Sequence, residues 1–96
     1  MNTEKNEVAA ITGTTESGFR YTLAPDTLDD YELLENLCDI DNGDAAKITG
    51  ASRQLLGDAQ IEALKDHVRK ENGRVPASEM IEEITQIFKG SQVKNS

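Results

Sequence analysis

The chain has 96 residues, of which 36% are hydrophobic and 29% charged, and it contains no tryptophan, two phenylalanines and two tyrosines. Eighteen acidic residues outnumber ten basic ones and give a net charge of −8. This length predicts one small domain with a thin core, and the negative charge argues against binding to nucleic acid or to anionic lipid.

The single cysteine and the N-terminal residues indicate in which cellular compartment the protein is expected. Cys38 is the single cysteine of the chain, so an internal disulfide is excluded and a reducing compartment is expected. The first residues, MNTEKNEVAAITG, are too polar for a signal peptide, and no apolar run has the length of a membrane span. We therefore expect a cytosolic protein that does not interact with membranes.

The first predicted element is a β-hairpin. Phe19, Tyr21 and Leu23 alternate with polar residues, and this period of two predicts a strand. Ile11 marks a strand before it, and residues 16–18 (ESG) supply the turn. Because an isolated hairpin is marginally stable in water, its apolar face is expected to pack on helices.

The first predicted helix begins with Thr27 or Asp29 as its N-cap and stops at Asn42-Gly43, where glycine accepts a left-handed conformation. Acidic residues in its first turn suit the positive end of the helix dipole. Its apolar stripe consists of Leu33, Leu34, Leu37 and Ile40.

Three further helices are predicted. The second covers residues 44–57 and contains Gly50, which costs about 1 kcal/mol relative to alanine. The third covers residues 58–73, and the fourth begins at Pro76 and ends at Gly90. The short connections favour antiparallel neighbours. The predicted fold class is therefore mainly α, a small four-helix bundle with a short N-terminal β-hairpin.

This fold is expected to form one helical domain over residues 9–90, between a flexible N-terminus over residues 1–8 and a flexible tail over residues 91–96. No internal repeat or low-complexity tract interrupts it.

No catalytic, cofactor-binding or metal-binding residue is predicted. No serine or cysteine of the chain lies in a nucleophile motif that His67 could serve as a base. Cys38 is interpreted as a small core residue. The DIDNGD segment from Asp39 looks like the start of a calcium loop, but Gly43 stands at the fifth position of that loop instead of the sixth. The twelfth position, which requires glutamate, is Gly50. An enzyme is therefore not expected.

The segment PDTLDDYELLENL resembles the attachment site of acyl carrier proteins. Thr27 stands where those proteins have serine, and a hairpin replaces the helix that precedes the site in carriers. Because Thr27 as an N-cap explains the same letters, a carrier function is rejected.

The order of signals over residues 17–96 resembles the small tail assembly chaperones of siphophages and prophages of Gram-positive bacteria. The matching segments are SGF at 17–19, LDDYELLE at 28–35, LLG at 55–57 and LKDHVRKENGRV at 64–75. The resemblance lies in their shared order and spacing, since no single segment is diagnostic. The segment AAKITGASRQ at 45–54 departs from the family pattern, because it is more polar and contains a glycine.

The resemblance implies binding without catalysis and without a cofactor. A tail assembly chaperone keeps the long, helical tape measure protein soluble in the host bacterial cytoplasm before the major tail protein polymerises around it. The resemblance leaves open whether the chain forms a homo-oligomer. A binder of amphipathic helices needs an apolar surface to receive them, and a strong net charge keeps it soluble.

The predicted partner-binding surface is the apolar stripe of the last helix. This stripe consists of Met80, Ile84, Ile87 and Phe88. The alternative interpretation is that these residues belong to the core, because every helix of a bundle needs one such stripe.

The alternative function is a small acidic regulatory adaptor or a DNA-mimic inhibitor. Gene order separates the two functions, because a chaperone gene lies between the genes of the major tail protein and the tape measure protein.

The resemblance also implies a longer form made by ribosomal frameshifting near the end of the short form. Lys94 and Asn95 are compatible with an A-rich slippery heptamer. We expect the gene to read AAA followed by AAY at these codons, and sequencing it decides the matter, since any other codons exclude this site.

Overall fold

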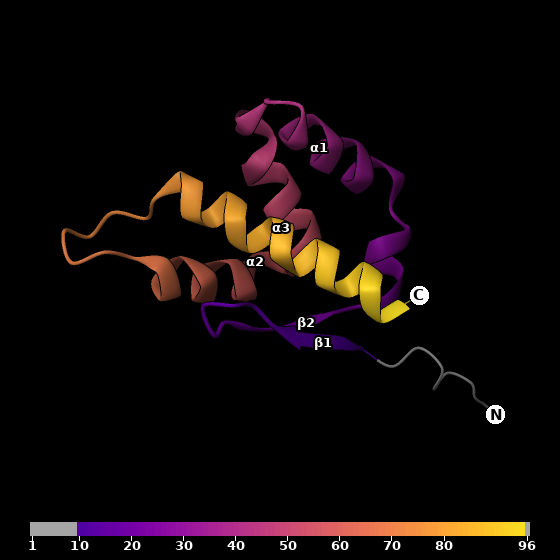
Figure 1. Ribbon diagram of the computed structural model, residues 1–96, viewed down its shortest axis with the longest axis horizontal. Coiled ribbons are helices and arrows are strands. Elements are labelled where there is room, and N and C mark those ends of the chain that lie inside the picture. Colours follow the sequence, from indigo (N-terminus) through magenta and orange to yellow (C-terminus); the bar gives the residue numbers. More distant parts are fainter. Residues whose placement is uncertain (1–9, 96) are drawn as a thin grey trace.

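The computed structural model describes residues 10–95 and shows a mainly helical protein that carries a two-stranded antiparallel hairpin (Figure 1). The strands are β1 (Ile11–Thr14) and β2 (Arg20–Leu23). The helices are α1 (Tyr31–Asp41), α2 (Ile48–Val68) and α3 (Ala77–Asn95). Two short 3-10 helices, η2 (Pro25–Asp29) and η3 (Ala45–Lys47), precede α1 and α2. The predicted flexible N-terminus and residue 9, the predicted start of the domain, lie outside the described residues.

The hairpin confirms the period-two prediction. Phe19, Tyr21 and Leu23 are all buried, and Tyr21 pairs with Gly13 in the antiparallel register. A side chain at position 13 would overlap the phenol ring of Tyr21, and a Cβ added at Gly90 of α3 would lie 3.1 Å from the Tyr21 hydroxyl oxygen. Tyr21 therefore fills the space between two glycines and fastens the hairpin to α3.

The outer edge of β2 is closed by a side chain. The Gln60 Oε1 atom of α2 accepts a hydrogen bond from the Thr22 N–H at 2.8 Å, and Gln60 Nε2 donates to the Thr22 carbonyl at 2.7 Å. Gln60 Nε2 also donates to the Leu56 carbonyl within α2. The glutamine amide thus satisfies the backbone of β2 as the peptide group of a third strand would.

The predicted four-helix bundle is correct only in part, because the second and third predicted helices follow each other without a loop as the two halves of α2, and the described residues form the three helices α1 to α3. The kink lies at Gly57, whose φ of 79° and ψ of 164° are not helical. This backbone region is accessible almost exclusively to glycine. The prediction that a helix ends at Gly57 is therefore confirmed, and the next helical segment begins at once in a new direction.

The start of α1 also differs from the prediction. Residues Pro25–Asp29 form η2, and the N-cap of α1 is Asp30, whose carboxylate accepts from the N–H groups of Glu32 and Leu33. The predicted stop at Asn42-Gly43 is confirmed, with Asn42 as the C-cap and Gly43 at a φ of 107°.

Helix α3 begins where Pro76 predicts it, since the Pro76 carbonyl accepts from the Met80 N–H at 3.1 Å. The predicted end at Gly90 is wrong, because α3 continues to Asn95 and the described part of the predicted tail is helical. Gly90 has no positive φ. It is a small residue that accommodates Tyr21, and it does not terminate the helix.

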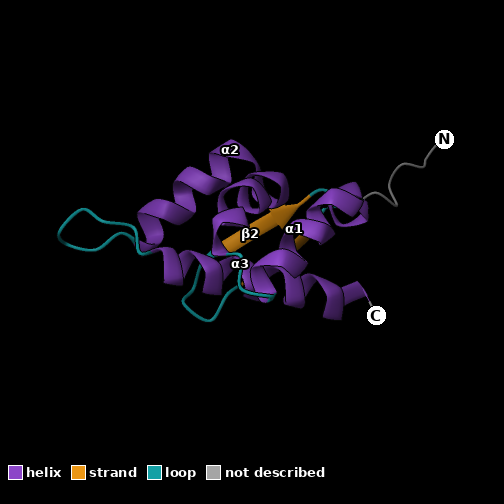
Figure 2. Cartoon of the chain, turned by 90° about the horizontal axis from the view of Figure 1, so that it is seen from above, coloured by secondary structure: helices purple, strands orange, loops and turns teal. Residues whose placement is uncertain are grey.

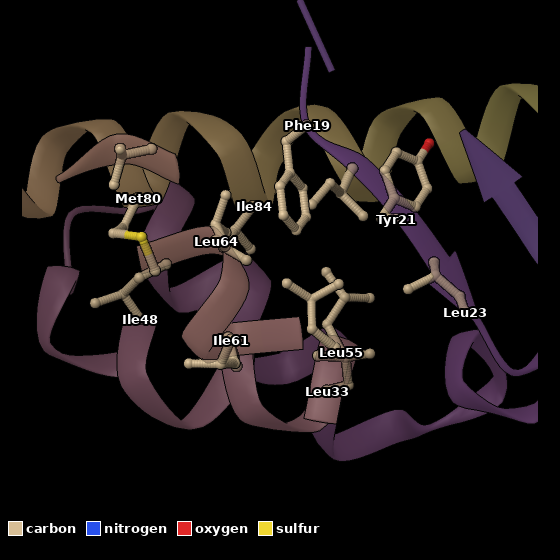
Figure 3. Packing of buried hydrophobic residues seen from close by; sticks show 14 residues of the cluster. Phe19, Tyr21, Leu23, Leu33, Ile48, Leu55, Ile61, Leu64, Met80 and Ile84 are labelled. Carbon is tan, nitrogen blue, oxygen red and sulfur yellow. The ribbon is translucent and has the colours of Figure 1, made fainter. Parts of the chain in front are cut away.

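The core lies between the hairpin and the three helices (Figure 3). Leu23, Leu33 and Leu64 come from β2, α1 and α2, and each is almost completely buried. The loop between α2 and α3 extends away from this core at one end of the molecule (Figure 2). It is closed by hydrogen bonds between the backbones of Lys70 and Arg74 and of Gly73 and Lys70.

The two glycines of α2 make a matched pair of substitutions. Gly50 is exposed in helical backbone with open space around an added Cβ, so Gly50→Ala is expected to raise the free energy of unfolding by about 0.5–1 kcal/mol. Gly57→Ala is expected to lower it by about 1–3 kcal/mol, because alanine is strained at this φ and ψ. Urea unfolding followed by circular dichroism measures both, and a Gly57→Ala variant as stable as the wild type would contradict the kink.

Candidate functional site

An apolar groove lies between α1 and α3, with Ile48 at the start of α2 also lining it. It has a volume of about 330 Å³. Its main apolar residues are Leu34, Leu37 and Ile40 from α1 and Ile81, Ile84 and Phe88 from α3. This volume is at the lower end of the range for ligand pockets, about 300–1,000 Å³. The groove therefore suits a few inserted side chains better than a large cofactor.

The groove exists because α1 and α3 share a support. Helix α1 packs on η3 and α2, whereas α3 packs on α2 and β1, and α1 lies above α3 in Figure 1. Leu33 of α1 is fully buried, while Leu34 is turned by about 100° around the helix and is half-buried. The leucine pair therefore serves two surfaces, the core and the groove.

The groove residues differ in how closely they pack against the core. Leu37, Ile40 and Ile81 are partly buried and pack against the core cluster. Leu34 and Phe88 are half-buried residues outside that packed set. These two side chains are the best placed of the groove residues to contact a partner without loss of the fold.

The structure distributes the predicted contact residues between core and groove. Met80 and Ile87 are buried in the core, at 9% and 0% exposure, as the alternative interpretation expects. Ile84 is also buried but lines the groove, and Phe88 lines it while half-exposed. Partner binding at these positions stays a prediction. Of the four predicted contact residues, Ile84 and Phe88 line the groove.

Three other residues from the sequence analysis can now be placed. Cys38 was expected in the core, but it is exposed and lines the groove. Asp39 of the calcium-like segment forms an ion pair with Lys47 at 3.6 Å. Thr27 lies in η2, where its N–H donates to the Ala24 carbonyl.

A second, polar cluster joins the hairpin turn to the helices, and the sequence analysis missed it. The Ser17 hydroxyl donates to Glu83 Oε2 at 2.8 Å and lies 2.9 Å from His67 Nε2. Glu83 is only 5% exposed, and its Oε1 has no hydrogen-bond partner among the described residues. The three residues are 50 and 66 positions apart in sequence, so no local motif signals them.

The hydrogen-bond order in this cluster does not suit a nucleophilic serine. The single proton of Ser17 goes to Glu83, so His67 Nε2 acts as a donor to the serine oxygen. In serine hydrolases the histidine instead accepts the serine proton, and donors await the negative charge of the intermediate. Here Glu16, Glu79 and Glu82 line the adjacent pocket and would repel that charge. The cluster is suited to fastening the turn to α2 and α3.

Among residues 10–95, no group of three or more histidine, cysteine, aspartate or glutamate side chains is placed to hold a metal ion. None of the helices formed by the described residues combines the length and apolar composition that a membrane crossing requires.

No protein-family model, curated protein or solved structure matches this chain. The case for a function therefore rests on the geometry and chemistry of the groove together with the sequence pattern.

The polar cluster leads to a stability prediction. Ser17→Ala removes the donor to Glu83 Oε2 and leaves a buried carboxylate without that hydrogen bond. The free energy of unfolding is expected to fall by about 1–3 kcal/mol. Adding Glu83→Gln to this variant is expected to restore part of the loss, because a buried neutral amide costs less than a buried charge.

Urea unfolding is the measurement, and Ser78→Ala at an exposed position of α3 is the control. If Ser17→Ala is no less stable than Ser78→Ala, the hydrogen bond from Ser17 to Glu83 does not stabilise the fold.

Proposed function

We propose that this protein is a non-catalytic phage tail assembly chaperone that binds helical segments of the tape measure protein and keeps it soluble for tail tube assembly. The observation that supports this function best is the apolar groove between α1 and α3, which leaves Leu34 and Phe88 half-exposed. The order of the SGF, LDDYELLE, LLG and GRV segments supplies the specific partner class.

The groove fits the demands of a helical client. An amphipathic helix presents apolar side chains at positions i, i+3, i+4 and i+7, and a groove between two helices receives them as anchors. Leu34, Leu37 and Phe88 provide aliphatic and aromatic surface from both walls. A net charge of −8 opposes self-association of the loaded protein.

The acidic adaptor or DNA mimic stays the alternative. Such a protein would compete with nucleic acid through its carboxylates, and an apolar groove would have no part in its binding. Substitutions in the groove therefore separate the two functions.

The test is co-expression with the tape measure protein of the same genome. With the wild-type chain, the tape measure protein is expected in the soluble fraction and in a complex with the chain. Leu34→Ser together with Phe88→Ser is expected to weaken the complex about tenfold or more, because each half-buried side chain contributes on the order of 1 kcal/mol.

The matched control is Val75→Ser, which removes a partly buried apolar side chain just before α3, outside the groove. Circular dichroism verifies that each variant is folded. A tape measure protein that is equally soluble with and without the chain would show the proposed function to be wrong. Ile87 is unsuitable for this test, because it is fully buried and its loss would destabilise the core.

A further inference from the structure

We infer that the groove takes an amphipathic helix in one lateral orientation, with lysine or arginine side chains on the flank that faces α1. This inference rests on the proposed function and specifies the chemistry of the bound segment. It comes from an uneven distribution of charge between the two walls of the groove.

Every charged residue of α1 is acidic. The charged residues of this helix are Glu32, Glu35, Asp39 and Asp41, with no basic residue among them. Asp41 lines the groove directly. Glu35 is exposed and stands one helical turn before Cys38, which also lines the groove. A helix seated in the groove would therefore have carboxylates along one flank.

These carboxylates are available for a partner. Asp39 is paired with Lys47, but Glu35 and Asp41 have no ion-pair partner among the described residues. The basic side chains Arg69, Lys70 and Arg74 are located after α2, in and beside the projecting loop. Apart from Asp39, the acidic residues of α1 therefore have no ion-pair partner within the described part of the chain.

The α3 wall has the opposite character at its margin. Lys89 and Thr85 line the groove there, and Lys89 has no ion-pair partner among residues 10–95. The two walls therefore favour different flanks of a bound helix, cationic toward α1 and neutral or acidic toward α3. Apolar insertion supplies affinity, and the charges select orientation and partner.

A second copy of the chain is a poorer occupant. A two-fold contact uses the same surface of both copies, and each copy brings its net charge of −8 to the contact. Like charges of this size oppose the approach of two copies. A cationic helix meets the α1 wall with attraction, which the net charge of the protein extends to longer range.

The test uses two synthetic peptides with the same leucine stripe at helical spacing and with either lysine or glutamate at every flanking position. The lysine peptide is expected to bind the full chain at least tenfold more tightly than the glutamate peptide, as measured by fluorescence anisotropy. Its affinity is expected to fall as sodium chloride rises, because salt screens the rim charges. Bound peptide is also expected to slow alkylation of Cys38 by iodoacetamide, since this thiol lines the groove.

Charge reversal locates the effect. Glu35→Lys with Asp41→Lys is expected to weaken the lysine peptide about tenfold, the loss expected for rim charge pairs at two positions. The charge control is Glu62→Lys with Asp66→Lys on the exposed face of α2. It changes the net charge equally, breaks the exposed ion pairs with Lys65 and Arg69, and is expected to have less than a threefold effect on peptide binding. Lys89→Glu is expected to tighten binding of the lysine peptide.

Equal binding of both peptides, equal losses in the two double variants, or unchanged Cys38 alkylation would each overturn the inference. A concentration-dependent dimer that Phe88→Ser abolishes would also overturn it in favour of a second copy.

The experiments distinguish a failure of the proposed helix orientation from a failure of the proposed chaperone function. If the Glu35/Asp41 variant solubilises the tape measure protein as well as wild type does, the orientation is wrong and the chaperone function stands. If wild type binds the lysine peptide at Cys38 but leaves the tape measure protein insoluble, the groove assignment stands and the chaperone function falls.

Discussion

Helix α2 is the element on which the rest of the structure depends, because α1, α3 and β2 all pack against it. Helices α1 and α3 both pack on α2 but have few direct contacts with each other, so their facing apolar side chains line a groove and remain partly accessible. Gly57 is not helical and divides α2 into two segments that run in different directions. The groove is thus a consequence of how the helices are supported, and it does not require a special motif.

The same arrangement links stability to binding. The side chains that hold α1 in place, such as Leu33, are fully buried, while Leu34 beside it lines the groove. Exposed apolar surface of this kind favours association. The large negative charge of the chain, concentrated along α1, opposes association with its own copies and still permits a cationic partner. Charge and apolar surface therefore act together in the proposed selection of a client.

Sequence patterns predicted the features that depend on neighbouring residues. The alternation of Phe19, Tyr21 and Leu23 located the buried face of β2, and Asn42-Gly43 located the end of α1. Gly57 likewise interrupts α2 where a helix end was predicted. Gly90 was misinterpreted, because a glycine can stop a helix or make room for another side chain. It accommodates Tyr21 inside α3, and only the tertiary structure separates this role from a helix stop.

The candidate sites were harder to predict, because both bring together residues that are distant in the chain. The stripe of α3 was recognised, but its division into core and groove depends on where α1 lies. Ile87 is buried and Phe88 is not, although they are adjacent in sequence. The cluster of Ser17, His67 and Glu83 joins a turn to two helices and leaves no trace in any local pattern. Such contacts follow from topology and not from spacing.

The closure of β2 by Gln60 has a consequence for how this protein can assemble. An exposed strand edge is a template on which further strands can add, which leads to edge-to-edge aggregation or strand exchange. With the Thr22 peptide group already satisfied by a side chain, the hairpin offers no such template at the centre of this edge. Growth of the sheet from one molecule to the next is thereby blocked at the Thr22 position of β2.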